Sequence, residues 1–258
     1  MKMTGAGIST LLSRLICPVA IFVIFMKVKR YKRYHGGFIH PERRPGLAKK
    51  IFRTSFPVSL QLGLETGSFA IAALMSGWLG HLQLASFQII VIVGSLGFCV
   101  YYSMANAVSV LVANAKGRDD KLAMRRVAFA GYHVILFLAA IASLTFFFFG
   151  RQLVGVFTED PEVIALTMTL ILPLILYQLC DATQITFSNA LRGTSNVVPM
   201  MWIAIVAYLV VGVPLTYLFG FTLSMGLWGI VLNFSVSLFI AAASFLYFFL
   251  RTTRLTCS

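Results

Sequence analysis

Two carboxylic acids, Glu65 and Asp181, stand out because each lies inside a long apolar stretch of the chain. An ionised side chain within a bilayer costs roughly 2.5–3.5 kcal/mol on insertion scales, so such acids usually face a cavity and serve a function. We expect no Lys or Arg deep enough in these stretches to neutralise them, which makes a mobile cation or a proton the natural partner. The alternative is a structural role, in which each carboxyl is protonated and hydrogen-bonds a neighbouring helix.

The residues around Glu65 support a functional role. Gly63 and Gly67 flank it in the spacing G-x-x-x-G, which predicts that a second helix backbone approaches closely here. Pro57, two turns earlier, lacks a backbone N–H, and this frees a carbonyl oxygen that can bind an ion or water.

The residues around Asp181 add further oxygen atoms. Tyr177 precedes it by one helical turn and Gln184 follows it by one, so all three share a helix face. Pro173 is expected to bend the same helix. A carboxylate, a phenol, an amide and a freed carbonyl form an all-oxygen site suited to a hard cation such as Na⁺. Tyr177 and Gln184 could equally hold helices together by hydrogen bonds.

Other candidates for chemistry are few. Gln61 and Gln88 are polar residues in apolar stretches that could line a path or bridge helices. The four cysteines are far apart and have no histidine at metal-ligand spacing, so neither a disulfide framework nor a zinc site is indicated. With no nucleophile elbow, phosphate loop or His/Cys/Asp cluster, the sequence predicts no enzyme, no cofactor and no metal beyond Na⁺ at Glu65 and Asp181.

Composition places these acids in a membrane protein. Of the 258 residues, 59% are hydrophobic and only 11% are charged, and the mean hydropathy is +0.88. A soluble fold cannot bury that much apolar surface, so soluble and disordered classes are excluded. The net charge of +13 does not indicate a nucleic-acid partner, because the basic residues lie in short gaps between apolar stretches rather than along a groove.

Seven apolar stretches are long enough to cross a bilayer, which takes about 20 residues each. They predict an all-α polytopic membrane protein with spans at 7–28, 50–78, 83–114, 124–149, 163–190, 197–220 and 226–250. In the outer loop before the fifth span, Asp160 is expected to cap a helix that begins at Pro161.

The distribution of basic residues predicts the orientation. Eighteen of the 21 Lys and Arg fall on one side of the predicted spans, most of them within 27–53 and 116–126. Because cytoplasmic loops carry the excess of positive charge, we expect the N-terminus outside and the C-terminus in the cytoplasm. The basic, Gly- and Pro-containing stretch at 29–49 separates a lone first helix (1–28) from a six-helix lobe (50–258).

Several motifs together resemble the multidrug and toxic compound extrusion (MATE) transporters of the MOP superfamily. The segment from Pro57 through Glu65 to Gly80, followed by Leu84–Ile89 and Val112–Gly117, is similar to the seventh and eighth helices of that family. Phe157–Val163, Tyr177–Gln184 and Ala190–Gly193 resemble the region of the tenth helix. Gly5–Arg14 is similar to the start of the sixth, so the resemblance covers essentially the whole chain.

The resemblance implies a cation-coupled (Na⁺ or H⁺) antiporter of the bacterial inner membrane that exports small amphipathic, cationic compounds. It implies that Glu65, Tyr177 and Asp181 form the cation site. It also implies that this chain equals helix six plus the second six-helix lobe, with the first lobe missing as a partner. Two alternatives stay open: a lipid-linked sugar flippase of the same superfamily, which should line its cavity with cationic residues, and a seven-helix receptor-like protein.

Overall fold

The computed structural model describes residues 2–28 and 46–254, and these residues form helices with no strand among them. The predicted linker at 29–49 lies mostly outside the described residues. The chain divides into two units, Met1–Lys50 and Ile51–Ser258, which are described separately. In the first unit, α1 (Lys2–Lys27) is one apolar helix with Pro18 in its interior.

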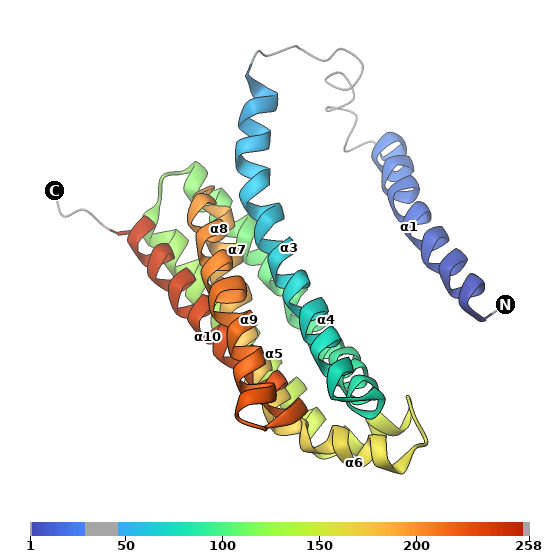
Figure 1. Cartoon of the computed structure of the whole chain (residues 1–258). Coiled ribbons are helices and arrows are strands. Elements are labelled where there is room, and N and C mark those ends of the chain that lie inside the picture. The colour runs from blue at the N-terminus through green and yellow to red at the C-terminus, as the bar shows by residue number, and fades with distance from the viewer. Residues whose placement is uncertain (1, 29–45, 255–258) are drawn as a thin grey trace. The chain divides into compact units, whose positions relative to one another are not determined.

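The second unit is a bundle of long helices (Figure 1). Its longer helices are α3 (Leu47–Leu79), α4 (His81–Gly117), α5 (Lys121–Gly155), α7 (Ile171–Gly193) and α10 (Gly226–Thr252). Its shorter segments are α6 (Pro161–Thr169) and the consecutive α8 (Val198–Ala204), η2 (Ile205–Gly212), α9 (Val213–Tyr217) and η3 (Leu218–Thr222). The first turn of α3 belongs to the first unit. Including α1, six helices or continuous helical segments are long and apolar enough to cross a membrane, and the bent pair of α6 and α7 gives a seventh. The predicted all-α fold is confirmed.

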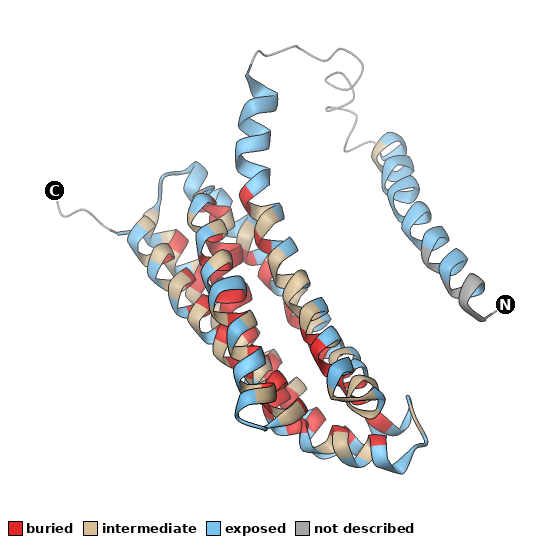
Figure 2. Ribbon diagram, viewed as in Figure 1, coloured by how far each residue is buried: buried red, intermediate tan, exposed pale blue. Residues whose placement is uncertain are grey.

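Helix α7 is the central element of the bundle and packs against α4, α5 and α10. It carries a buried polar series, Gln178, Asp181, Gln184, Thr186, Ser188 and Asn189. Because a bilayer cannot solvate these groups, the helix that carries them must be enclosed by others. Figure 2 shows buried residues where the helices of this bundle face one another and exposed residues on the outer sides.

The predicted span at 163–190 is present as a bent pair of helices, as expected from Pro173. α6 and α7 meet at Leu170 with a bend of 47°. Pro173 explains the position of the break: its ring conflicts with the carbonyl four residues earlier, and that residue, Thr169, is the last of α6. The predicted start of this helix is confirmed, since the Asp160 side chain accepts a hydrogen bond from the Glu162 N–H at 2.9 Å and Pro161 is the first helical residue.

The close approach expected at the G-x-x-x-G spacing is not found among the described residues. A methyl group added at Gly63 or Gly67 would meet nothing within 4 Å in the described structure. The close helix approach lies instead at Gly193, where an added Cβ would come within 2.5 Å of the Ser109 carbonyl oxygen. Glycine spacing alone could not distinguish these positions, because it does not say whether a second helix is there.

Candidate functional site

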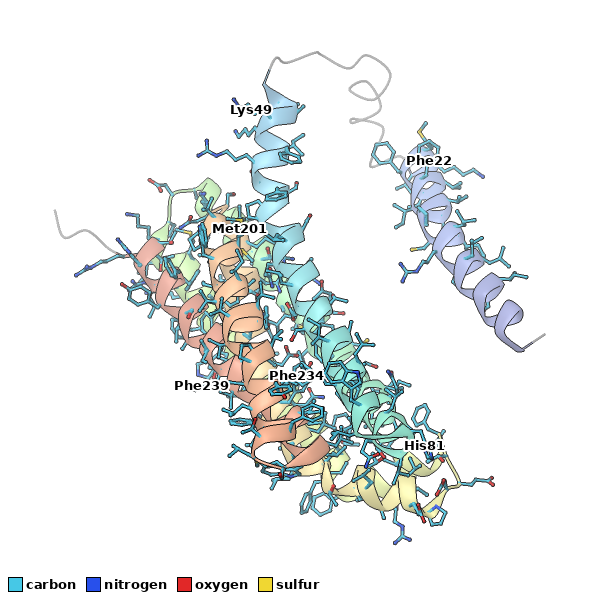
Figure 3. The ribbon with its side chains drawn as sticks, viewed as in Figure 1. Phe22, Lys49, His81, Met201, Phe234 and Phe239 are labelled. Atoms are coloured by element: carbon cyan, nitrogen blue, oxygen red, sulfur yellow. The ribbon has the colours of Figure 1, made fainter. Side chains whose placement is uncertain are left out.

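A central cavity of about 430 Å³ opens among α3, α4, α7 and α10. Six aromatic side chains contribute to its walls: Phe69, Phe87, Phe98, Tyr102, Tyr177 and Phe234. Its polar wall residues are Gln61, Glu65, Thr66, Ser95, Gln184, Ser188, Asn189 and Arg192. Figure 3 labels Phe234, which stacks on Phe69 with ring centroids 4.6 Å apart. The cavity therefore combines an aromatic surface with one carboxyl group, Glu65.

Glu65 is supplied by α3 and is partly buried in the cavity wall. Gln61, one turn earlier on the same helix, donates a hydrogen bond from Nε2 to Glu65 Oε2 at 3.1 Å. This bond orients the carboxyl group, and Gln61 itself is only 1% exposed. The other amide oxygen, Gln61 Oε1, is buried without a hydrogen-bond partner and so can still accept a hydrogen bond or bind a cation.

Asp181 lies in α7, close enough to Glu65 for their charges to interact, but it does not line the central cavity. It is 1% exposed, and its Oδ2 accepts a hydrogen bond from the hydroxyl of Tyr101 in α4 at 2.5 Å. Tyr101 is itself fully buried. The sequence analysis missed Tyr101, although a phenol near the middle of an apolar span requires a polar partner and could have pointed to it.

Tyr177 and Gln184 both line the central cavity, as expected, but each has a further role in packing. The Tyr177 ring meets Phe69 edge-on, with centroids 6.2 Å apart. Gln184 donates from Nε2 to the hydroxyl of Tyr208 in η2 at 3.0 Å, which joins two helical segments. Gln184 Oε1 is buried and unpaired, so the same amide offers an acceptor.

The other predicted supporting residues fall in different places. Pro57 is buried in α3 and Pro173 is buried in α7, but neither lines the cavity. The Pro173 carbonyl accepts a hydrogen bond from Ser235 Oγ at 3.4 Å. Gln88 is exposed on α4 and is not part of the cavity wall. The structure thus brings Gln61, Glu65, Tyr177 and Gln184 to one space and leaves Gln88 outside it.

One basic residue, Arg192, shares the cavity with Glu65, which the sequence analysis did not foresee. Arg192, near the end of α7, contributes to the wall of the same cavity as Glu65, and its charge acts on that carboxyl. Its Nε is buried without a hydrogen-bond partner. Arg192 lies in the last turn of α7, which ends at Gly193.

The sequence comparisons agree with this geometry. The pattern of the MatE family matches residues 57–218. A probable multidrug resistance protein NorM of Xanthomonas campestris pv. campestris is 31% identical over 212 residues, which cover 82% of this chain and 46% of the relative. The corresponding protein of Mannheimia succiniciproducens is 29% identical over 249 residues, 94% of this chain and 53% of the relative. The chain thus spans about half the length of these curated relatives.

Solved structures show the same fold. A eukaryotic MATE transporter, AtDTX14, matches with a TM-score of 0.83 at 19% identity over 97% of this chain and 57% of that one. A MATE protein in complex with MaL6 matches with a TM-score of 0.80 at 20% identity over 98% and 57%. The family pattern covers more than half of the chain and includes the residues of α3, α4 and α7 that line the central cavity. The chain therefore belongs to the MatE family of multidrug and toxic compound extrusion proteins.

Proposed function

We propose that this chain forms one half of a cation-coupled antiporter that exports amphipathic, cationic small molecules. The observation that carries the proposal is the central cavity, in which the carboxyl of Glu65 lies among six aromatic side chains. Aromatic faces attract organic cations by cation–π interaction, and a carboxylate supplies the opposite charge. The names of the NorM relatives, probable multidrug resistance proteins, support this substrate class.

Export is coupled to ion entry if the organic cation and the inorganic cation (Na⁺ or H⁺) cannot both bind at Glu65. A Na⁺ ion or a proton on Glu65 neutralises the charge that the organic cation needs. The inorganic cation therefore lowers the affinity of the site for the organic cation, and the organic cation lowers the affinity for the inorganic one by the same factor. Entry of the inorganic cation from the outside, where its electrochemical potential is higher, then favours release of the substrate there. The inorganic cation favours one arrangement of the helices over another only to the extent that it binds the two arrangements with different affinity.

In this proposal, Glu65, Tyr177 and Asp181 form the cation site. Gln61 and Gln184 line the same cavity, and their buried, unpaired amide oxygens are additional ligands in this proposal. Carboxylate, phenol and amide oxygens together suit a hard cation. Asp181 takes part through its charge behind the cavity wall, and the choice between Na⁺ and H⁺ depends on how many of these oxygens the ion reaches at once.

The proposed setting is the bacterial inner membrane, with the N-terminus outside and the C-terminus in the cytoplasm, as the excess of basic residues on one side predicts. The proposed partner is a first lobe, because alternating access moves one helix bundle against another around a shared site. A flippase for lipid-linked sugars would need several cationic side chains in the cavity. Among the described residues that line it, Arg192 is the one Lys or Arg.

The proposal can be tested by dye binding to the purified 258-residue chain in detergent. A fluorescent aromatic cation should bind to the unaltered chain, and either Na⁺ or a fall in pH should displace it. A neutral dye of similar size is the control, because its binding should not respond to the inorganic cation. If binding of the cationic dye is unaffected by both Na⁺ and pH, the proposed exchange at Glu65 is wrong.

A second experiment tests whether this chain is one half of a transporter. The chain alone, reconstituted in liposomes with an imposed Na⁺ or pH gradient, should show no gradient-driven dye movement, because only one wall of the cleft is present. Movement of the dye by the chain alone would contradict this reading, unless crosslinking shows that two copies form the cleft.

A further inference from the structure

A second, basic cavity lies outside the site described above. It has a volume of about 500 Å³ and is lined by Arg125, Tyr247, Leu250, Arg251 and Arg254. These residues come from the first turns of α5 and the last turns of α10, with Arg254 two residues after the end of that helix. Three of the five side chains are guanidinium groups, and none is acidic.

One of the three arginines is fixed by the protein and two are not. Arg125 donates from Nε to Thr253 Oγ1 and from Nη2 to the Leu250 carbonyl oxygen, both at 3.0 Å. These bonds tie α5 to the end of α10 and place a positive charge at the negative end of that helix. Within the described residues, no side-chain hydrogen bond or ion pair is found for Arg251 or Arg254.

The surrounding charges add to the positive charge of this cavity. Lys121 donates to the Arg254 carbonyl oxygen at 3.5 Å, which brings a further positive charge to the same region. Of the nearby acids, Asp120 caps α5 by accepting from the Ala123 N–H at 2.8 Å. Positive charges that share one cavity attract an anion, and an anion with several acceptor oxygens can accept hydrogen bonds from more than one guanidinium group.

The position of the basic cavity indicates where the anion comes from. α10 has 27 residues and is therefore about 40 Å long, which exceeds a hydrocarbon core of about 30 Å and carries its end into the headgroup region. Tyr247 is 59% exposed and precedes Arg251 by one turn on the same helix face. An exposed tyrosine beside arginines is typical of the membrane interface. Phe239, two turns further into the span, is 65% exposed and lies at the outer edge of the bundle (Figure 3).

We propose that the basic cavity binds the phosphate of an anionic phospholipid headgroup, with Arg251 and Arg254 as its ligands and Arg125 as the fixed base of the site. The acyl chains of the lipid then follow the exposed apolar side of α10. Basic pockets between membrane helices have the right chemistry for such headgroups. This inference is independent of the central cavity and of the proposed transport.

The test is native mass spectrometry of the purified chain titrated with phosphatidylglycerol or with phosphatidylcholine. The unaltered chain should bind phosphatidylglycerol on the order of tenfold more tightly, as expected for two basic residues at a membrane surface. The double variant Arg251→Gln/Arg254→Gln should lose that preference, and Arg251→Lys/Arg254→Lys should keep most of it. The matched control is Arg118→Gln/Arg151→Gln, which alters two exposed arginines outside the basic cavity and should leave the preference unchanged.

The alternatives give different results. Equal binding of the two lipids by the unaltered chain, or an unchanged preference in the Arg251→Gln/Arg254→Gln variant, would overturn the proposal. Inorganic phosphate that displaces phosphatidylglycerol at equal concentration would show a free-anion site instead of a lipid site. If the double Gln variant fails to fold, the single variants Arg251→Gln and Arg254→Gln should each reduce the preference, and no reduction in either would overturn the proposal.

Discussion

Glu65 on α3 and Asp181 on α7 are the two acids of the predicted cation site, and their surroundings differ. Glu65 lies in the wall of the central cavity and is oriented by Gln61 from its own helix. Asp181 is 1% exposed behind that wall and is bound by Tyr101 from a different helix. One acid is open to a ligand, whereas the other joins two helices.

The helices that carry these acids also differ, because α7 is enclosed and α3 is more open. α7 is enclosed by α4, α5 and α10, and most of its polar side chains are buried. α3 contributes five buried residues: Pro57, Gln61, Ala72, Met75 and Ser76. Open space surrounds Gly63 and Gly67, on either side of Glu65. We infer that Glu65 is the acid that exchanges cations and that Asp181 acts on it through charge and through the packing of α4 and α7.

The largest expected effect separates the two acids directly. Glu65→Gln should weaken binding of the fluorescent cation, because it removes the charge that this cation needs. The binding that remains, through the aromatic side chains, should no longer respond to Na⁺ or to low pH. Asp181→Asn should weaken this response without removing it, since it deletes a charge behind the wall. Dye titrations at several Na⁺ concentrations and pH values measure both effects. Complete loss in Asp181→Asn with little change in Glu65→Gln would reverse the assignment.

The next effect concerns the bond that holds Asp181. Tyr101→Phe removes the donor and leaves a buried carboxyl unsatisfied, which should destabilise the chain by about 1–3 kcal/mol. Asp181→Asn keeps an oxygen that Tyr101 can bond and should cost less. Thermal unfolding in detergent measures both variants, and Tyr102→Phe, an adjacent tyrosine that lines the cavity, is the control. Equal stability of Tyr101→Phe and the unaltered chain would show that this bond contributes little.

This comparison also shows what the sequence could predict. The spans followed from apolar length, and the cap at Asp160 followed from its position before Pro161. Glu65 and Asp181 were found because charged groups are rare in apolar stretches. Their different surroundings were not found, because Tyr101 is 80 residues away from Asp181 and its partner depends on how α4 packs against α7.

The sequence missed two features, namely the part of Arg192 in the cavity wall and the position of the close helix contact. A basic residue before a glycine is typical of a helix end at the membrane surface, and only the bundle shows that this side chain lines the central cavity. Likewise, two glycines at a spacing of four predict a contact only if another helix is present. Both features depend on long-range packing, which a local pattern does not contain.

A smaller effect is expected at Arg192, which lines the cavity with Glu65 and acts on its charge. Its positive charge repels an arriving cation. Arg192→Gln should therefore tighten Na⁺ binding several-fold, as expected for removing a like charge at intermediate distance in a partly buried site. Arg192→Lys should behave like the unaltered chain. Because structural damage would weaken binding, weaker binding in Arg192→Gln would contradict this role.

The smallest effect is expected around Glu65 itself, at Gly63 and Gly67. An alanine at either position meets no atom within 4 Å, so Gly63→Ala and Gly67→Ala should leave the unfolding temperature in detergent unchanged or raise it slightly. A slight rise is expected because alanine favours a helix interior by roughly 0.5–1 kcal/mol over glycine.

The contrasting variant is Gly193→Ala on α7, whose added Cβ would lie 2.5 Å from the Ser109 carbonyl oxygen and would force α4 and α7 apart. It should destabilise the chain by about 1–3 kcal/mol, as overpacking usually does. If Gly67→Ala proves as harmful as Gly193→Ala, then the face of α3 around Glu65 is packed, and the contrast between an open Glu65 and an enclosed Asp181 is wrong.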